Sequence, residues 1–315
     1  MRGRTTPASA GVLFCAALLA VAGCATPQVA ALRARGAENL PERIELTRVP
    51  FFPQDEYQCG PAALATVLTY AGSTATPEAL ASQVYLPDRK GSLQAEMLAA
   101  TRRHGRVAYR LAPQLEDVLR EVADGAPVIV LQNLALDFAP LWHYAVVVGY
   151  DLPRAEIILR SGTTSRMMVE LGAFERTWSR GEHWAMLALA PGRLPATASE
   201  DRYVAAVAAL ERVDPDAARR AYTVAIGRWP GSLAARIGEG NAAYALRDLA
   251  GAEAAYREAI RRHPGAADAW NNLAQTLHEL RRHDEALAAA HRAVDIGGPR
   301  IAQYRATLQA IAEAR

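Results

Sequence analysis

Two side chains in the first half of the chain, Cys59 and His143, have the types and settings that nucleophilic thiol chemistry requires. Cys59 is followed by Gly60, Pro61 and a run of helix-forming residues. Because proline suits the first turn of a helix, the thiol is predicted at a helix N-terminus, where unpaired N–H groups favour thiolate over thiol. His143 opens an apolar run that predicts a strand, so its imidazole can be held rigidly as a base. The pair could carry acyl transfer through a thioester.

A polar side chain shortly before the cysteine could complete such a site. Acyl transfer generates an oxyanion that needs hydrogen-bond donors. The backbone N–H of Cys59 is one predicted donor and the side-chain amide of Gln54 is the other, with Gln58 as the runner-up. The other histidines are poorer candidates for the base. His104 ends a predicted helix beside two arginines, His183 precedes a strand that no hairpin partner follows, and four lie in the C-terminal helices.

Each of these residues, taken alone, could have a purely structural role. A free cysteine is most often a small buried core residue, and a histidine at a strand start is most often a hydrogen-bonded residue at the rim of a core. The combination of Gln54, Cys59 and His143 favours the catalytic interpretation over both. One such thiol and scattered histidines lack the spacing of metal ligands, and the chain has no phosphate-binding loop, so neither a metal nor a cofactor is predicted.

These motifs resemble those of a known peptidase family. Gln54, the run Cys59-Gly60-Pro61-Ala62 and the later run His143-Tyr144-Ala145-Val146-Val147 are similar to the papain-like peptidases that remove double-glycine leaders from bacteriocin precursors. The resemblance covers approximately residues 46–190. It implies a papain-like fold with Cys59 as nucleophile, His143 as base and Gln54 as oxyanion donor. Members are usually cytoplasmic domains of ABC exporters, so the resemblance implies peptidase chemistry more strongly than bacteriocin substrates.

The chain departs from this family at the residue that orients the histidine. The family uses an aspartate on the next strand, whereas the nearest downstream acid here is Asp151, which an extended strand places about 26 Å from His143. A turn at 151–155 makes His143 face the region from Ser161 to Thr163, which holds no carboxylate. Ser161 is the first candidate to orient the ring, and Thr163 is the alternative. The missing acid keeps a second hypothesis open, in which a degenerate peptidase serves as a binding module of an envelope scaffold.

The first residues predict an export signal. Two arginines precede an apolar run over residues 11–22, which is too short to be a stable membrane anchor. The run ends in Val21-Ala22-Gly23-Cys24, which resembles a bacterial lipobox and implies cleavage before Cys24 and acylation of that cysteine. The alternatives are an ordinary signal peptide and an uncleaved anchor.

Lipidation would leave one free thiol. Cys15 leaves with the signal and Cys24 is acylated, so Cys59 remains and no disulfide can form within the chain. Residue 25 is alanine and not aspartate, which by the sorting habit of such lipoproteins favours the outer membrane, with the body facing the periplasm.

The C-terminal part of the chain carries an internal repeat. Pro230 and Pro264 are 34 residues apart, and Gly298 continues the period with Pro299 just after it. Other residues keep the same phase: Tyr222 and Tyr256; Ala218, Ala252 and Ala286; Ala225, Ala259 and Ala293. The pattern resembles the 34-residue tetratricopeptide repeat in three units, although an Ala-rich bundle is the alternative. The first unit lacks aromatic and glycine cues in its early helix, and 300–315 is predicted to be a cap helix.

The predicted organisation follows from these patterns. Residues 1–23 form the signal and 24–45 a tether. Residues 46–192 form an α+β papain-like peptidase domain, and 199–315 form an all-α tetratricopeptide solenoid. Within the peptidase domain, helices are expected over 59–71, 77–86, 92–104 and 114–123. Strands are expected after them, over 128–131, 144–150, 156–160 and 184–189.

Composition limits the partners. The net charge of +2 comes from interspersed basic and acidic residues, which is not the stripe that nucleic acids require. The predicted partners are a protein or peptide substrate, a protein bound by the repeats, and the membrane through lipidated Cys24. The predicted function is that of an envelope lipoprotein with cysteine-peptidase activity.

Overall fold

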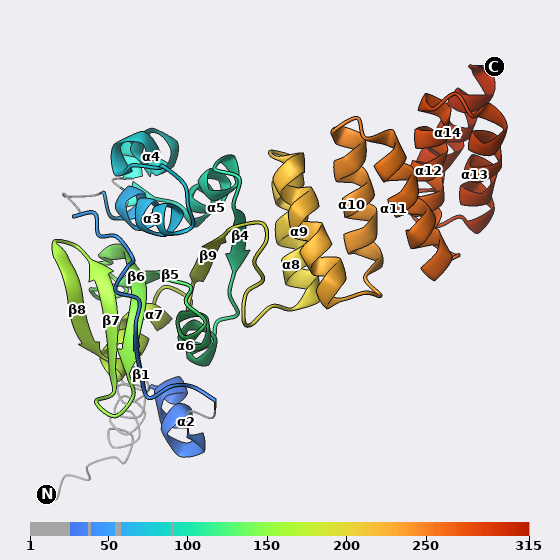
Figure 1. Ribbon diagram of the computed structural model, residues 1–315. Helices are drawn as coiled ribbons and strands as arrows, with labels where there is room; N and C mark the ends of the chain where they lie inside the picture. Colours follow the sequence, from blue (N-terminus) through green and yellow to red (C-terminus); the bar gives the residue numbers. More distant parts are fainter. Residues whose placement is uncertain (1–25, 37–38, 54–57, 90, 315) are drawn as a thin grey trace, which may run out of the picture.

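The computed structural model describes residues 26–36, 39–53, 58–89 and 91–314. It shows a mixed α/β domain followed by a row of paired helices (Figure 1). The fold class predicted from the sequence is confirmed. The predicted signal segment, Cys24 and Gln54 lie outside the described residues. Among the helices that the structure describes, none is both long and apolar enough to cross a membrane.

The mixed domain is built on a seven-stranded sheet with the order β4-β9-β5-β6-β7-β8, in which β1 also pairs with β6. All of its strand pairs are antiparallel. The strands are β1 (Arg43–Glu45), β4 (Val107–Arg110), β5 (Val128–Asn133), β6 (Trp142–Asp151), β7 (Glu156–Ser161), β8 (Thr164–Glu170) and β9 (Ala185–Leu189). A separate two-stranded sheet pairs β2 (Tyr85–Leu86) with β3 (Gly91–Ser92).

Helices cover both faces of this sheet, which explains why the central strands β5, β6 and β7 are buried over most of their length. One face packs against α3 (Cys59–Tyr70), α4 (Pro77–Val84) and α5 (Gln94–Arg103). The other packs against α6 (Leu115–Ala123) and α7 (Leu171–Ser179). The residues from Tyr144 to Val148 of β6 therefore alternate between the two cores.

In the mixed domain the strands β2, β3, β4 and β8 and the helix α7 were not predicted. The strand β8 has an exposed burial pattern and many polar residues, so its sequence carries no apolar signal. No hairpin partner was expected after β9, and its two neighbours in the sheet, β4 and β5, both precede it in the chain. Its neighbour β4 comes from far earlier in the chain, so no local turn indicates the pairing.

The prediction of a tether over residues 24–45 is wrong for two segments. Residues Pro27–Arg35 form helix α2, in which Val29 is buried. The carboxylate of Glu175 accepts the N–H groups of Gln28 and Val29 at 2.9 and 2.8 Å, which satisfies two donors of the first helical turn. Strand β1 follows and pairs with β6. The stabilising partner lies far along the chain, so the local Ala/Arg-rich composition did not reveal it.

The C-terminal helices form three pairs and a last single helix. They are α8 (Glu200–Glu211), α9 (Pro215–Arg228), α10 (Leu233–Ala245), α11 (Leu249–Arg262), α12 (Ala267–Glu279), α13 (His283–Ile296) and α14 (Ile301–Glu313). A Cβ atom at Gly238 would lie 2.2 Å from the ring of Tyr222, and one at Gly240 would lie 2.5 Å from the ring of Tyr256. The glycines therefore permit the close helix packing that the 34-residue pattern predicted.

The first helix of the array, α8, packs against the edge strand β4 of the mixed domain. The ring of Tyr203 is buried and lies 6.4 Å from the ring of Tyr109, and its hydroxyl donates to the carbonyl of Arg193. This helix therefore meets a sheet edge on one side, where its counterparts meet another repeat, and it packs against α9 and α10 on the other side. One continuous apolar core joins the two parts.

Candidate active site

Cys59 is the first residue of α3, and its side chain is half-buried. Backbone hydrogen bonds from Cys59, Gly60 and Tyr144 lower the pKa of the thiol, as expected at a helix N-terminus. Burial has the larger effect, and the net pKa of the thiol is raised. The N–H groups at the helix start therefore favour the thiolate as expected, but the site as a whole favours the neutral thiol.

His143 is the second residue of β6 and lies next to Tyr144 in the chain. Because the backbone at Tyr144 hydrogen-bonds the thiol, the imidazole is carried by the strand segment that contacts Cys59. Its Nε2 atom lies 2.8 Å from the hydroxyl of Ser161, a buried residue at the end of β7. Burial lowers the pKa of His143. The ring is thus held by a neutral partner in a desolvated setting.

Asp151 lies at the opposite end of β6 from His143. It pairs with Arg43, whose guanidinium is 3.0 Å from the carboxylate, and accepts the backbone N–H of Arg154. It has a structural role there. Ser161 therefore occupies the position where an orienting acid is expected, and a hydroxyl can hold the ring but brings no negative charge to stabilise an imidazolium.

Two residues that support the site were missed by the sequence interpretation, Ser92 and Tyr144. A Cβ atom at Gly60 would lie 2.2 Å from Oγ of Ser92, so only glycine permits the strand β3 to approach the start of α3. The hydroxyl of Tyr144 donates to the carbonyl of Ser92 at 3.1 Å, and its ring packs edge-on against Trp184. The glycine after the cysteine was the available signal of this close approach.

The candidate oxyanion donors differ in what the structure describes of them. Gln54, the first candidate, lies outside the described residues. Gln58 is the N-cap residue of α3, and its exposed side chain makes no hydrogen bond to the helix end. The backbone N–H of Cys59 is one of the groups that hydrogen-bond the thiol. The assignment of Gln54 with Gln58 as runner-up stays a prediction.

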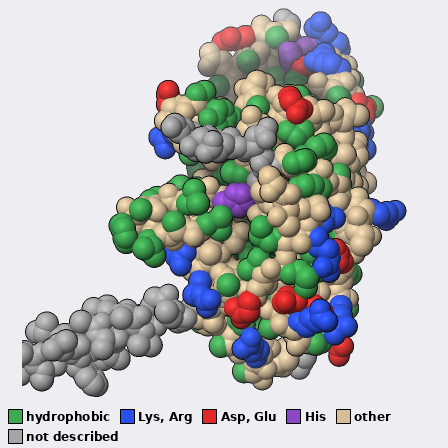
Figure 2. Space-filling model, turned by 90° about the vertical axis from the view of Figure 1, so that its left-hand side faces the viewer, with side chains coloured by type: hydrophobic (Ala, Val, Ile, Leu, Met, Phe, Trp, Pro, Cys, Tyr) green, Lys and Arg blue, Asp and Glu red, His purple; other side chains and the backbone are tan. Residues whose placement is uncertain are grey.

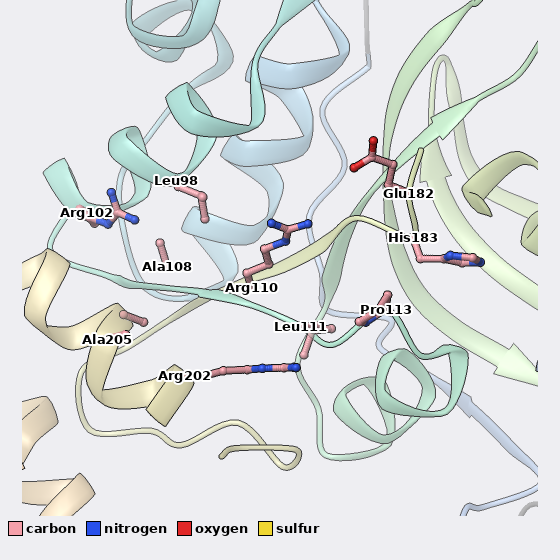
Figure 3. A pocket seen from close by; sticks show the side chains of 11 residues that line it. Leu98, Arg102, Ala108, Arg110, Leu111, Pro113, Glu182, His183, Arg202 and Ala205 are labelled. Atoms are coloured by element: carbon pink, nitrogen blue, oxygen red, sulfur yellow. The ribbon is translucent and has the colours of Figure 1, made fainter. Parts of the chain in front are cut away.

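His183 belongs to a different part of the molecule. It lines a pocket of about 470 Å³ between α5, β4 and α8, together with Arg102, Arg110 and Arg202. Figure 3 shows its ring directed away from these arginines, and the ring packs edge-on against Trp178 at 4.7 Å. Cys59 does not line this pocket.

The fold and the site define a peptidase-fold domain with a helix-borne thiol, followed by helical repeats. Comparison with known families agrees. Residues 46–184 match the Peptidase C39 like family, and residues 203–264 and 237–301 match the tetratricopeptide repeat. The chain therefore carries a peptidase C39-like domain followed by tetratricopeptide repeats, which confirms the resemblance predicted from the sequence.

Solved structures with some similarity cover one part of the chain each. A putative C39-like peptidase from Bacillus anthracis is 20% identical, covers 47% of this chain and 98% of its own, and has a TM-score of 0.40. The TPR2B domain in a pHsp70 complex of yeast Sti1 is 18% identical, with 37% and 98% covered and a TM-score of 0.35. MamA is 18% identical, with 38% and 77% covered and a TM-score of 0.32. No curated protein sequence matches the chain.

Proposed function

We propose that the chain is a thiol-dependent peptidase of the bacterial cell envelope whose repeats recruit a protein substrate or partner. The observation that carries the proposal is that Cys59 packs against the buried cluster that contains Tyr144, the residue after His143, whose backbone also lowers the pKa of the thiol. This packing brings a helix-borne nucleophile to the strand that holds His143. The family match of residues 46–184 supports the same chemistry.

The proposed reaction is acyl transfer through Cys59. His143 accepts the thiol proton while the sulfur attacks the scissile carbonyl, and the N–H of Cys59 with Gln54 stabilises the oxyanion. His143 then donates the proton to the departing amine, which leaves a thioester. Water attacks the thioester, with His143 as base, and releases the acid and the free thiol.

Burial sets the resting state of this pair. It raises the pKa of Cys59 and lowers the pKa of His143. Both shifts favour the neutral thiol and the neutral imidazole over the ion pair. In this proposal, proton transfer therefore accompanies attack on the substrate, and the thiol is protected from adventitious reaction when no substrate is bound.

A thiol-directed acyl probe tests the activity. The wild-type chain is expected to become labelled at neutral pH and to cleave an unfolded polypeptide, and the Cys59→Ser variant is expected to do neither. Failure of the wild-type protein to react, with His143 intact, would contradict the peptidase proposal.

The envelope location is a separate part of the proposal and rests on the lipobox-like run that ends in Cys24. Cells that express the chain and are fed radioactive palmitate are expected to label it, and the Cys24→Ser variant is expected to lose the label. Fractionation should place the wild-type protein in the outer membrane. A label that persists in Cys24→Ser would contradict the lipid anchor.

A second candidate function is a binding module that has kept the peptidase fold without its activity. The neutral partner of His143 and the raised pKa of the Cys59 thiol favour it. In that case the wild-type protein and Cys59→Ser would retain the same partner through the repeats with equal affinity, and neither would cleave it.

A further inference from the structure

The segment that joins β5 to β6 carries a concentration of exposed apolar side chains. Nine large hydrophobic residues are exposed in the part of the chain that the structure describes, and five of them lie between positions 134 and 142: Leu134, Leu136, Phe138, Leu141 and Trp142. Phe138 is 86% exposed. Figure 2 shows hydrophobic side chains gathered on a projecting part of one face, beside a histidine. Such a patch on a folded protein usually marks an interaction site.

The backbone of this segment, called here the apolar loop (residues 134–142), is fixed at its base. The side-chain carbonyl of Asn133 accepts the N–H groups of Ala135 and Leu141 at 3.1 and 2.9 Å. The guanidinium of Arg180 donates to the carbonyls of Asn133 and Ala135 at 2.9 and 2.8 Å. The loop is thus a built structure that holds its apolar side chains out in solvent.

The apolar loop leads directly into the candidate active site. Its last residue, Trp142, precedes His143 and lies two positions before Tyr144, whose backbone contacts the Cys59 thiol. At about 3.3 Å per residue, two positions of strand span about 7 Å. A polypeptide whose carbonyl reaches Cys59 therefore has neighbouring side chains within reach of Trp142 and the loop beyond it.

Charge distinguishes a polypeptide from a lipid surface as the occupant. The only charged residue of the apolar loop is Asp137, which is exposed between Leu136 and Phe138. Insertion of the loop into a bilayer would bury this carboxylate at considerable cost. Segments that bind anionic lipid surfaces carry lysine or arginine on their polar side, and this loop has neither.

We propose that Phe138 and Trp142, with Leu136 beside them, form an apolar subsite that receives a large aliphatic or aromatic side chain of a polypeptide near its scissile bond. The term scissile rests on the proposed function, but binding at the subsite does not require cleavage. The proposal assigns a substrate class, polypeptides with a bulky apolar residue close to the bond that meets Cys59.

Binding is tested in the full chain with Cys59→Ala, which cannot turn substrate over. The probe is a positional-scanning library of fluorescein-labelled heptapeptides, followed by fluorescence anisotropy. At one position, leucine or phenylalanine should bind at least ten-fold more tightly than alanine or aspartate. Phe138→Ala and Trp142→Ala should each remove this preference, and Phe138→Leu should largely keep it. Leu246→Ala, which truncates an exposed apolar residue in the repeats, is the matched control and should keep it fully.

Several results would overturn the proposal. One is a library with no apolar preference, or a preference that survives Phe138→Ala. Another is loss of binding to vesicles of phosphatidylethanolamine and phosphatidylglycerol in Phe138→Ala without any peptide preference, which would identify a lipid surface as the occupant. A third is a wild-type dimer that Phe138→Ala dissociates, again without peptide preference.

Failure of the proposed function gives a different result. If protein with Cys59 intact cleaves no library peptide, but the Cys59→Ala protein shows an apolar preference that depends on Phe138, the peptidase proposal fails and the subsite stands as a peptide-binding site. If peptides are cleaved with no apolar preference, the peptidase proposal stands and the subsite fails.

Discussion

The two parts of the molecule are held together in different ways. In the repeats the contacts are local, since Gly238 and Gly240 of α10 pack on Tyr222 of α9 and Tyr256 of α11, the two helices next to α10 in the chain. In the peptidase-like domain the contacts around Cys59 occur once each and join distant segments, as Gly60 with Ser92 and Cys59 with Tyr144 do. The packing of the repeats is therefore set by neighbouring helices, whereas the candidate active site depends on contacts between segments that are far apart in the chain.

The largest expected effect tests the role of Cys59 itself. Replacement Cys59→Ala should lower peptide hydrolysis by more than about 1000-fold, because loss of a catalytic nucleophile removes the covalent route. The measurement is kcat/KM on a peptide that the wild-type protein cleaves. The thermal unfolding midpoint should stay close to that of the wild type, since a half-buried thiol is replaced by a side chain of similar size. Retained hydrolysis in Cys59→Ala would mean that another residue is the nucleophile.

The second effect concerns a support of the site. Gly60→Val should reduce hydrolysis by about 100-fold and destabilise the domain by about 2–3 kcal/mol, because the added side chain overlaps Ser92. Activity assays and urea unfolding measure the two quantities. The control is Gly192→Ala, at a position with open space around it, which should change neither. Wild-type activity in Gly60→Val would show that the contact with Ser92 is dispensable.

The sequence separation between contacting residues also explains which features could be predicted from the sequence. The helical repeats were predictable because Pro230, Pro264 and Gly298 mark a period that local packing imposes. The proximity of His143 to the region of Ser161 follows from a hairpin turn, which is a local feature.

Other features depend on partners distant in the chain and could not be predicted. The helix α2 is stabilised by Glu175, and the start of α3 rests against Ser92. Neither contact produces a periodic or local sequence pattern, because the residues that meet are far apart in the chain and the segments between them do not indicate which residues will meet. The exposed edge strand β8 was missed for another reason, since it has no apolar pattern.

Two glycines on helices of the repeats give the third effect, with opposite signs. Gly240→Ala should destabilise the array by about 1–3 kcal/mol, because its Cβ would lie 2.5 Å from the ring of Tyr256. Gly227→Ala, on α9 with open space around it, should instead stabilise by about 0.5–1 kcal/mol through helix propensity. Urea unfolding followed by circular dichroism measures both.

Activity sharpens the interpretation of these two variants. Neither should alter the rate at which an acyl probe labels Cys59, because the repeats do not contribute side chains to the site. A slower labelling in Gly240→Ala would show that the two parts are coupled more closely than their contacts indicate.

The fourth effect is smaller and concerns the hydrogen bond between Ser161 and His143, the proposed base. Ser161→Ala removes the hydroxyl 2.8 Å from Nε2 of His143. A neutral hydrogen bond contributes about 0.5–1.5 kcal/mol, so kcat/KM should fall by about 2–12-fold, mainly through kcat. Ser161→Thr retains a hydroxyl and should recover part of the loss. A fall above 100-fold in Ser161→Ala would instead indicate that the hydroxyl acts on the reacting groups directly.

The last and smallest effect is a difference in pKa between the Cys59 thiol and a thiol placed on the repeats. With Cys15→Ser and Cys24→Ser in the background, Cys59 is the only thiol, and adding Cys59→Ala and Ala254→Cys moves that thiol to an exposed position in the middle of α11. Burial raises the pKa of Cys59, so its thiolate fraction at a given pH is lower than that of the exposed thiol. The rate of alkylation by iodoacetamide should therefore rise with pH in both proteins, with a midpoint above about 8.5 for Cys59 and near about 8.5 for the exposed thiol. At the same pH, Cys59 should react more slowly than the exposed thiol. A midpoint below that of the exposed thiol would mean that the hydrogen bonds at the start of α3 outweigh burial and that the thiolate is formed before substrate binds.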